Sequence, residues 1–118
     1  MDRVLVVDDE RDIRMVVSEI LSEEGYQVAG AEDGAAALTQ LYAFRPQLVL
    51  LDLMMPRMDG WEFRRAQRSD PEVCDIPVLV LSALGRQDDL EVAGYIDKPF
   101  ALEELLSAVR LHASRRAA

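Results

Sequence analysis

Apolar runs recur along the chain and are separated by amphipathic or polar stretches. Runs of four to six apolar residues without a polar interruption are typical of strands that are buried on both faces of a parallel sheet. The pattern predicts five strands, over Val4 to Val7, Tyr26 to Ala31, Gln47 to Leu51, Ile76 to Leu81 and Ala93 to Ile96. Pro77 falls near the first position of the fourth strand, where a sheet tolerates proline.

Segments with helical periodicity alternate with these strands. In the first, apolar residues recur at helical spacing at Ile13, Val16, Val17, Ile20 and Leu21. Gly25 ends this helix, and Asp33 is the predicted N-cap of a second helix over Ala35 to Phe44. A third, basic-faced helix is predicted over Trp61 to Arg68, with inward residues Trp61, Phe63 and Ala66. The last runs from Leu102 to about Ala113, before a basic tail over 114–118 that we expect to fray.

Strands that alternate with helices in this way predict an α/β fold, a doubly wound parallel sheet with helices on both faces. The chain shows no repeat, low-complexity segment or linker, so we expect a single domain over 1–118 with its core over 3–113. The stretch from Leu84 to Val92 is short and polar. It has room for a loop or for one to two helical turns.

Polar residues follow four of the predicted strands. They are Asp8 and Asp9, Asp52, Ser82 and Lys98. Because the carboxyl ends of parallel strands meet at one edge of a sheet, we expect these side chains to lie together. Each has a structural explanation when taken alone, since a strand-end aspartate is more often a helix cap and a lone lysine is usually solvated. Their joint placement favours a chemical site.

Clustered carboxylates predict a cation. They raise one another's pKa unless a positive charge intervenes, and Lys98 supplies only one such charge. Mg²⁺, which prefers oxygen ligands and binds beside phosphate groups, is the natural second partner. In the resulting hypothesis Asp52 attacks phosphorus, and Mg²⁺ is held by Asp9 and Asp52. Lys98 and Ser82 then bind phosphoryl oxygens.

Four stretches resemble the receiver domain of two-component response regulators. They are Val7 to Asp9, Asp52 to Gly60, Leu81 to Ala83 and Lys98 to Phe100, and the resemblance extends from Val4 to Val109. It implies a five-stranded flavodoxin-like fold and phosphorylation of Asp52 by a sensor histidine kinase or a phosphotransfer protein. It also implies Mg²⁺ ligands at Asp9, at Asp52 and at the backbone carbonyl of Met54, with Asp8 in support.

The resemblance further implies a conformational switch. Ser82 and Tyr95 match its hydroxyl and aromatic positions, although a half-buried strand aromatic explains Tyr95 equally well. The Lys98–Pro99 peptide bond is often cis in the family. The interval from Ser82 to Lys98 is shorter than in the family, so the fourth helix is expected to be short or absent. Met54 and Leu84 occupy positions that tune dephosphorylation, and their apolar side chains predict slow decay of the phosphorylated form.

Charge and composition narrow the remaining choices. The net charge of −9 argues against direct binding of nucleic acid. Cys74 is the only cysteine, which excludes an internal disulfide and favours a reducing, cytoplasmic setting. We expect no targeting or membrane-spanning segment, and a monomer or a phosphorylation-dependent homodimer. Neither Cys74 nor His112 carries a catalytic or metal-binding signal.

Two other functions compete with the phosphoacceptor hypothesis. Haloacid-dehalogenase-like phosphatases also use a strand-end aspartate, but they need a second aspartate two positions later, where this chain has Met54. Enzymatic turnover of phosphate esters is therefore not expected. A phosphate-independent adaptor with the same fold is the other alternative. The chain has no predicted output domain, so it either acts alone as a phosphorelay or docking element or belongs to a longer protein.

Overall fold

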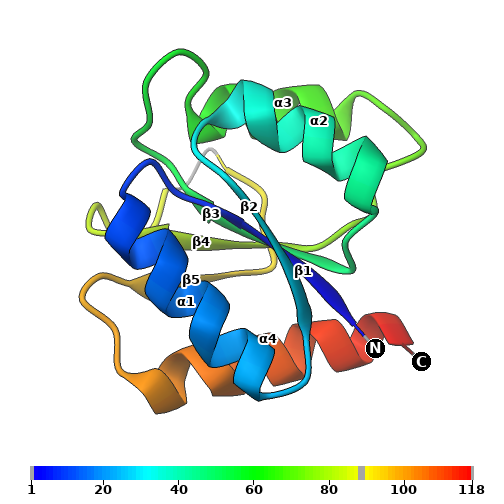
Figure 1. Ribbon diagram of the computed structural model, residues 1–118. Coiled ribbons are helices and arrows are strands. Elements are labelled where there is room, and N and C mark those ends of the chain that lie inside the picture. The colour runs from blue at the N-terminus through cyan, green and yellow to red at the C-terminus, as the bar shows by residue number, and fades with distance from the viewer. Residues whose placement is uncertain (1, 88–89, 118) are drawn as a thin grey trace.

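A parallel sheet of five strands forms the centre of the computed structural model, which describes residues 2–87 and 90–117 (Figure 1). In chain order the elements are β1 (Arg3–Val7), α1 (Arg11–Glu23), β2 (Gln27–Ala31), α2 (Gly34–Phe44), β3 (Leu48–Asp52), α3 (Gly60–Arg68), β4 (Val78–Ser82), β5 (Gly94–Asp97) and α4 (Leu102–Ala117). The strand order is β2-β1-β3-β4-β5. This arrangement confirms the predicted α/β fold class.

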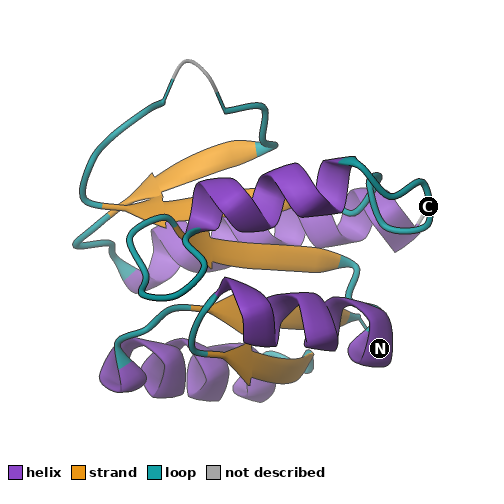
Figure 2. Ribbon diagram, turned by 90° about the horizontal axis from the view of Figure 1, so that it is seen from above, coloured by secondary structure: helices purple, strands orange, loops and turns teal. Residues whose placement is uncertain are grey.

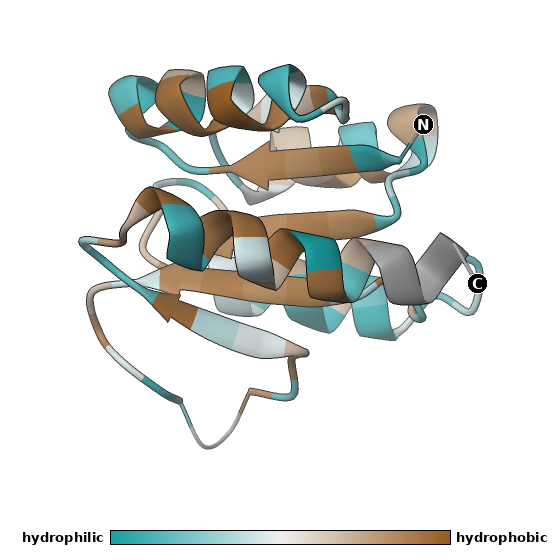
Figure 3. Ribbon diagram, turned by 90° about the horizontal axis from the view of Figure 1, so that it is seen from below, coloured by the Kyte–Doolittle hydropathy of each residue, from teal (hydrophilic) through white to brown (hydrophobic). Residues whose placement is uncertain are grey.

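Helices cover both faces of the sheet. Figure 1 shows α2 and α3 on one side and α1 and α4 on the other. Successive side chains of a strand point to opposite faces, so Leu5 and Val7 join the core under α2 and α3, whereas Val4 and Val6 join the core under α1 and α4. All five residues of β3 and of β4 are buried. In Figure 3 the central strands are accordingly brown over most of their length.

The predicted helix boundaries are confirmed where the sequence carries a local signal. Gly25 follows α1 with a φ of +96°, a left-handed conformation that suits glycine. The Asp33 carboxylate caps α2 by accepting a hydrogen bond of 2.8 Å from the backbone N–H of Ala36. Asp59 caps α3 in a reciprocal arrangement with Glu62. These caps place the loops that precede α2 and α3.

The buried side of α3 differs from the prediction. Phe63 is buried as expected, but Arg64 and Gln67 are buried too, while Trp61 and Ala66 are only half-buried. Gln67 is accommodated because its amide donates hydrogen bonds of 2.9 Å to two backbone carbonyls in the loop after α3. Arg64 donates a hydrogen bond of 2.7 Å to the side-chain oxygen of Gln67. Because their polar atoms are hydrogen-bonded, these two side chains can be buried where polar residues are otherwise expected to be exposed.

The connection from β4 to β5 contains no helix in its described parts, residues 83–87 and 90–93 (Figure 2). This bears out the expectation of a short or absent fourth helix. Arg64 anchors the connection to α3 by donating a hydrogen bond of 2.9 Å to the carbonyl of Glu91. Leu90 and Val92 pack against the core under α2 and α3. The loop therefore covers part of the sheet that a helix would otherwise cover.

The last helix is longer than predicted. The backbone of α4 is helical as far as Ala117, beyond the predicted end at about Ala113, and residue 118 lies outside the described residues. The fraying expected over 114–118 stays a prediction. Within the described residues, none of the helices is long and apolar enough to cross a membrane.

Gly60 should be intolerant of any side chain. A Cβ atom there would lie 2.7 Å from the Asp52 carbonyl oxygen and 2.7 Å from the Leu53 Cα. We expect Gly60→Ala to lower the free energy of unfolding by about 1–3 kcal/mol, measured by urea denaturation, because backbone atoms cannot yield as side chains do. Gly30→Ala is the control, since its Cβ would first meet the flexible Arg14 side chain at 3.4 Å. Equal stability of the two variants would contradict this account.

Candidate functional site

The predicted site residues meet at the edge of the sheet where β1, β3, β4 and β5 end. Asp52 and Ser82 are the last residues of β3 and β4, whereas Asp9 and Lys98 lie just beyond β1 and β5. A cleft of about 270 Å³ is lined by Asp9, Glu10, Asp52, Met54, Ser82, Ala83, Leu84 and Lys98. The strand-end convergence inferred from the apolar runs is thus present in the structure.

Asp8 holds the Lys98 ammonium group in place. Its carboxylate is fully buried and accepts a hydrogen bond of 2.8 Å from the Lys98 ammonium. The second carboxylate oxygen accepts a hydrogen bond of 2.9 Å from the backbone N–H of Glu10. The N-cap of α1 is Glu10, without a side-chain capping bond, so the helix-cap explanation for Asp8 and Asp9 is wrong.

Three carboxylates cluster around one ammonium. Oxygen atoms of Asp8, Asp9 and Asp52 all lie within 4.8 Å of one another. The Lys98 nitrogen is 3.7 Å from an oxygen of Asp52, but its hydrogen bond goes to Asp8. Asp9 is exposed and Asp52 is almost buried, so the cluster opens to solvent on one side. Negative charge exceeds positive charge in this part of the cleft.

The protonation equilibria of the site reflect this excess. Burial, followed by the charge of Asp8, raises the pKa of Asp52 to about 6, although Lys98 opposes the rise and Asp9 adds to it. For Lys98, burial disfavours the charged form, but the hydrogen bond and charge of Asp8 outweigh it and raise the pKa. The ammonium therefore stays charged, whereas Asp52 lacks full compensation.

This donor set fits a small, hard divalent cation. Carboxylate oxygens at this spacing are ligands that Mg²⁺ accepts, and a bound cation would offset the carboxylate repulsion that adds to the effect of burial on the pKa of Asp52. Asp9 and Asp52 line the cleft, whereas Asp8 is committed to Lys98 and Glu10. Met54 lines the cleft and is 61% exposed. The ligand role of its carbonyl stays a prediction.

The two predicted switch residues lie in different surroundings. Ser82 is buried in the cleft, and its hydroxyl oxygen accepts a hydrogen bond of 2.9 Å from the backbone N–H of Leu84. Tyr95 does not line the cleft; its hydroxyl donates to the Gln87 carbonyl at 3.0 Å and accepts from the Gln87 N–H at 3.2 Å. Arg86 stacks over the Tyr95 ring. Tyr95 is half-buried here, and its switch role stays a prediction.

The Lys98–Pro99 peptide bond, which follows β5, is cis, as the family resemblance implies. Sequence reasoning assigned Glu10 no role in the site, yet it lines the cleft with a carboxylate oxygen 4.0 Å from the Lys98 nitrogen. The position of Glu10 directly after Asp8 and Asp9 could have indicated that it belongs to the site. Cys74 and His112 do not line this cleft.

Known structures share this fold over nearly the whole chain. The chemotaxis response regulator CheY4 of Vibrio cholerae is 33% identical with a TM-score of 0.87, covering 94% of this chain and 98% of that chain. A CheY-like response regulator receiver domain protein from Methanospirillum hungatei is 30% identical with a TM-score of 0.86, covering 98% of this chain and 96% of that chain.

Sequence comparison points the same way. Response regulator MprA of Mycolicibacterium vanbaalenii is 46% identical over 115 residues, which cover 92% of this chain and 48% of the relative. The MprA of Mycobacterium avium is 45% identical, with 92% and 49% covered. The chain thus spans about half the length of these curated relatives. The family model of the response regulator receiver domain matches residues 4–110, and the chain therefore belongs to that family.

Proposed function

We propose that Asp52 accepts a phosphoryl group from a phosphohistidine of a sensor kinase or a phosphotransfer protein, with Mg²⁺ as cofactor. The convergence of Asp52, Ser82 and Lys98 in one cleft carries this proposal. Asp9, Asp52 and the Met54 carbonyl would hold the ion, with Asp8 in support. Bound Mg²⁺ supplies positive charge that offsets the negative charge developing on the phosphoryl oxygens.

Asp52, Lys98 and Ser82 have different roles in the proposed phosphoryl transfer. A carboxylate oxygen of Asp52 attacks phosphorus and forms an acyl phosphate, while the P–N bond breaks and the donor imidazole leaves with the electron pair. Lys98 lies 3.7 Å from Asp52 and can contact a phosphoryl oxygen while Asp8 still holds it. The Ser82 oxygen already accepts the Leu84 N–H, so its hydroxyl hydrogen remains available for another phosphoryl oxygen.

The same residues argue against the competing functions. Met54 cannot serve as the acid or base that a phosphatase of the haloacid-dehalogenase type needs. A phosphate-independent adaptor would have no need of the Asp52, Ser82 and Lys98 set, and the relatives lend that alternative no support. The role proposed for this domain is therefore signalling rather than substrate turnover.

Several finer points stay predictions. They are the switch through Ser82 and Tyr95, the downstream protein target, the oligomeric state as a monomer or a phosphorylation-dependent homodimer, the domain limits 1–118, the cytoplasmic location and the absence of direct nucleic-acid contacts. Because the chain spans about half the length of its MprA relatives, the output of the whole protein is outside this proposal.

Phosphorylation by a small-molecule donor tests the proposal directly. With acetyl phosphate and Mg²⁺, intact-protein mass spectrometry should show the addition of one phosphoryl group that hydroxylamine removes, as expected for an acyl phosphate. Asp52→Asn should abolish the addition because no carboxylate remains to attack. Asp97→Asn, which alters an exposed carboxylate at the end of β5, is the matched control and should still be phosphorylated. Unchanged phosphorylation of Asp52→Asn would refute the assignment.

The phosphorylated domain should lose its phosphoryl group slowly. Met54 and Leu84 line the cleft and are 61% and 50% exposed, and neither side chain carries a strong hydrogen-bonding group that could hold an attacking water. We expect Met54→Asn to accelerate the loss, because its amide can hold that water, whereas Met54→Leu should not. Decay is followed by mass spectrometry after removal of the donor. A lifetime of seconds for the original chain with Mg²⁺ would count against this account.

The pKa of Asp52 predicts an unusual pH dependence of stability. The value of about 6 in the folded chain exceeds the unfolded value of about 3.9, so the folded state binds the proton more tightly. The contribution of Asp52 to the free energy of unfolding should therefore become more favourable as the pH falls from neutral through about 6 toward 4. In the absence of divalent ions, Asp52→Asn should be more stable at neutral pH by about 1–2 kcal/mol, after allowance for solvent screening.

Urea denaturation in a chelating buffer measures this difference. The advantage of Asp52→Asn should shrink toward pH 4, where the original carboxyl group is protonated in the folded state, and Asp97→Asn should show no comparable advantage. A destabilised Asp52→Asn at neutral pH would show that the carboxylate is well compensated without a metal ion.

A further inference from the structure

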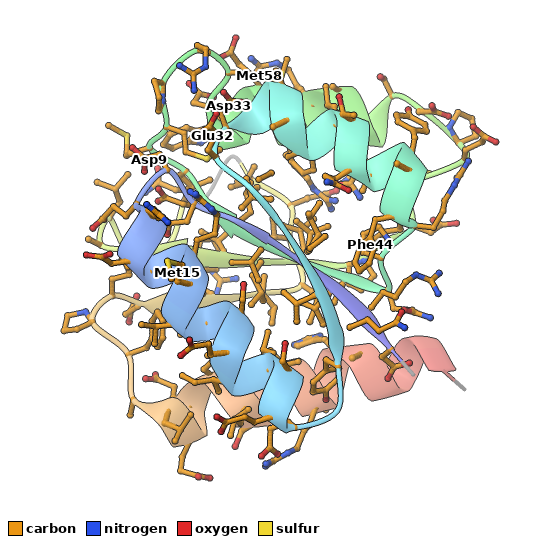
Figure 4. All side chains as sticks on the ribbon, in the orientation of Figure 1. Asp9, Met15, Glu32, Asp33, Phe44 and Met58 are labelled. Atoms are coloured by element: carbon orange, nitrogen blue, oxygen red, sulfur yellow. The ribbon has the colours of Figure 1, made fainter. Side chains whose placement is uncertain are left out.

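The loop between β3 and α3, residues 53–59, is tied to the beginning of α2 at two points. The backbone N–H of Gly34 donates a hydrogen bond of 2.8 Å to the carbonyl of Met58. The Arg57 guanidinium donates a hydrogen bond of 2.5 Å to the Asp33 carboxylate. Figure 4 shows Met58, Asp33 and Glu32 together on the side of the molecule where Asp9 lies.

Gly34 makes this close approach possible. A Cβ atom at Gly34 would lie 2.5 Å from the Cγ of Met58 and 2.7 Å from its carbonyl oxygen. Such distances exclude every other residue unless the loop moves away from α2. The contact between the loop and α2 is therefore a close backbone approach and not a loose surface encounter.

Arg57 and Asp33 complete the contact. Arg57 has a φ of +64°, a left-handed conformation that is unfavourable for a residue with a Cβ atom. The Asp33 side chain is only 6% exposed, and its two oxygens are divided between Arg57 and the N–H of Ala36 at the start of α2. Glu32 adds a second negative charge 3.8 Å from the guanidinium. The ion pair thus holds the loop in a conformation that the backbone of Arg57 does not favour.

The other end of the loop is fixed to the strand. The N–H of Gly60 donates a hydrogen bond of 2.9 Å to the carbonyl of Leu53, directly after Asp52. Met54 therefore lies between an anchor at the base of the loop and the Arg57–Asp33 anchor at its tip. Met54 itself lines the cleft.

We propose that Asp33 and Arg57 are positioning residues for the metal site, because their ion pair fixes the loop that carries the Met54 carbonyl. The proposal rests on the function proposed above. Neither residue lines the cleft, so their effect is indirect. Partners of metal ligands commonly change metal affinity by about ten- to a hundredfold, and a pair one step further out should change it by roughly three- to tenfold.

Calorimetric Mg²⁺ titrations of the whole chain, well below its unfolding temperature, test this proposal. Arg57→Gln and Asp33→Asn should each raise the Mg²⁺ Kd by roughly three- to tenfold. Asparagine still caps α2, so Asp33→Asn removes the charge without removing the cap. The double variant should be no weaker than the weaker single variant, because the two residues act as one unit.

Two further variants separate positioning from stability. Arg57→Gly relieves the left-handed backbone but removes the ion pair, so it should raise the Mg²⁺ Kd with little loss of thermal stability. Arg110→Gln is the matched control. It removes an exposed arginine that donates a hydrogen bond of 3.0 Å to Glu24 at the end of α1, and it should leave the Kd unchanged.

The outcomes distinguish this inference from the proposed function. If the original chain binds Mg²⁺ and Asp52→Asn does not, the metal site stands, and Kd values within twofold for Arg57→Gln and Asp33→Asn overturn the positioning role alone. A lower unfolding temperature with an unchanged Kd, or additive effects in the double variant, also overturns it. If the original chain shows no saturable Mg²⁺ binding, the proposed function itself fails.

Discussion

The ion pair between Lys98 and the buried Asp8 is the interaction on which the rest of the site depends. Lys98 is the single lysine among thirteen basic residues, the others being arginines. An ammonium is a compact charge that can keep one carboxylate partner while it contacts a second oxygen, whereas a planar guanidinium favours a fixed two-point geometry. Asp8 makes this possible because it is fully buried and takes the Lys98 hydrogen bond at 2.8 Å.

The same ion pair leaves Asp52 short of positive charge. Two more carboxylates lie within 4.8 Å, and Lys98 is already committed to one of them. Burial of Asp52, together with these neighbouring charges, raises its pKa to about 6, so the folded chain tolerates an unfavourable charge at the cleft. The fully buried strands β3 and β4 offset that cost, because their apolar side chains contribute to cores on both faces of the sheet.

The position of the site could be predicted from sequence because two strong regularities act together. Apolar runs identify buried parallel strands, and parallel strands deliver the residues at their carboxyl ends to one edge. These two regularities were sufficient to predict that Asp52, Ser82 and Lys98 lie together. The burial of Arg64 and Gln67 was not predicted, because burial of a polar side chain depends on hydrogen-bond partners that the sequence does not reveal. Here those partners include the carbonyls of residues 73, 76 and 91. The Arg57–Asp33 pair spans 24 positions and has no local signal.

The connection from β4 to β5, which has no helix in its described parts, changes the surroundings of the cleft while Ser82 keeps its place there. Ser82 remains in the cleft, since β4 alone sets its position and its register opposite Asp97. Tyr95 is different, because its hydroxyl is bonded to Gln87 within the loop that stands in place of the helix. The hydroxyl of Ser82 also accepts the N–H of Leu84 in that loop. The loop therefore makes hydrogen bonds to both predicted switch residues, so the hydroxyl groups of Ser82 and Tyr95 are linked through one short stretch of chain.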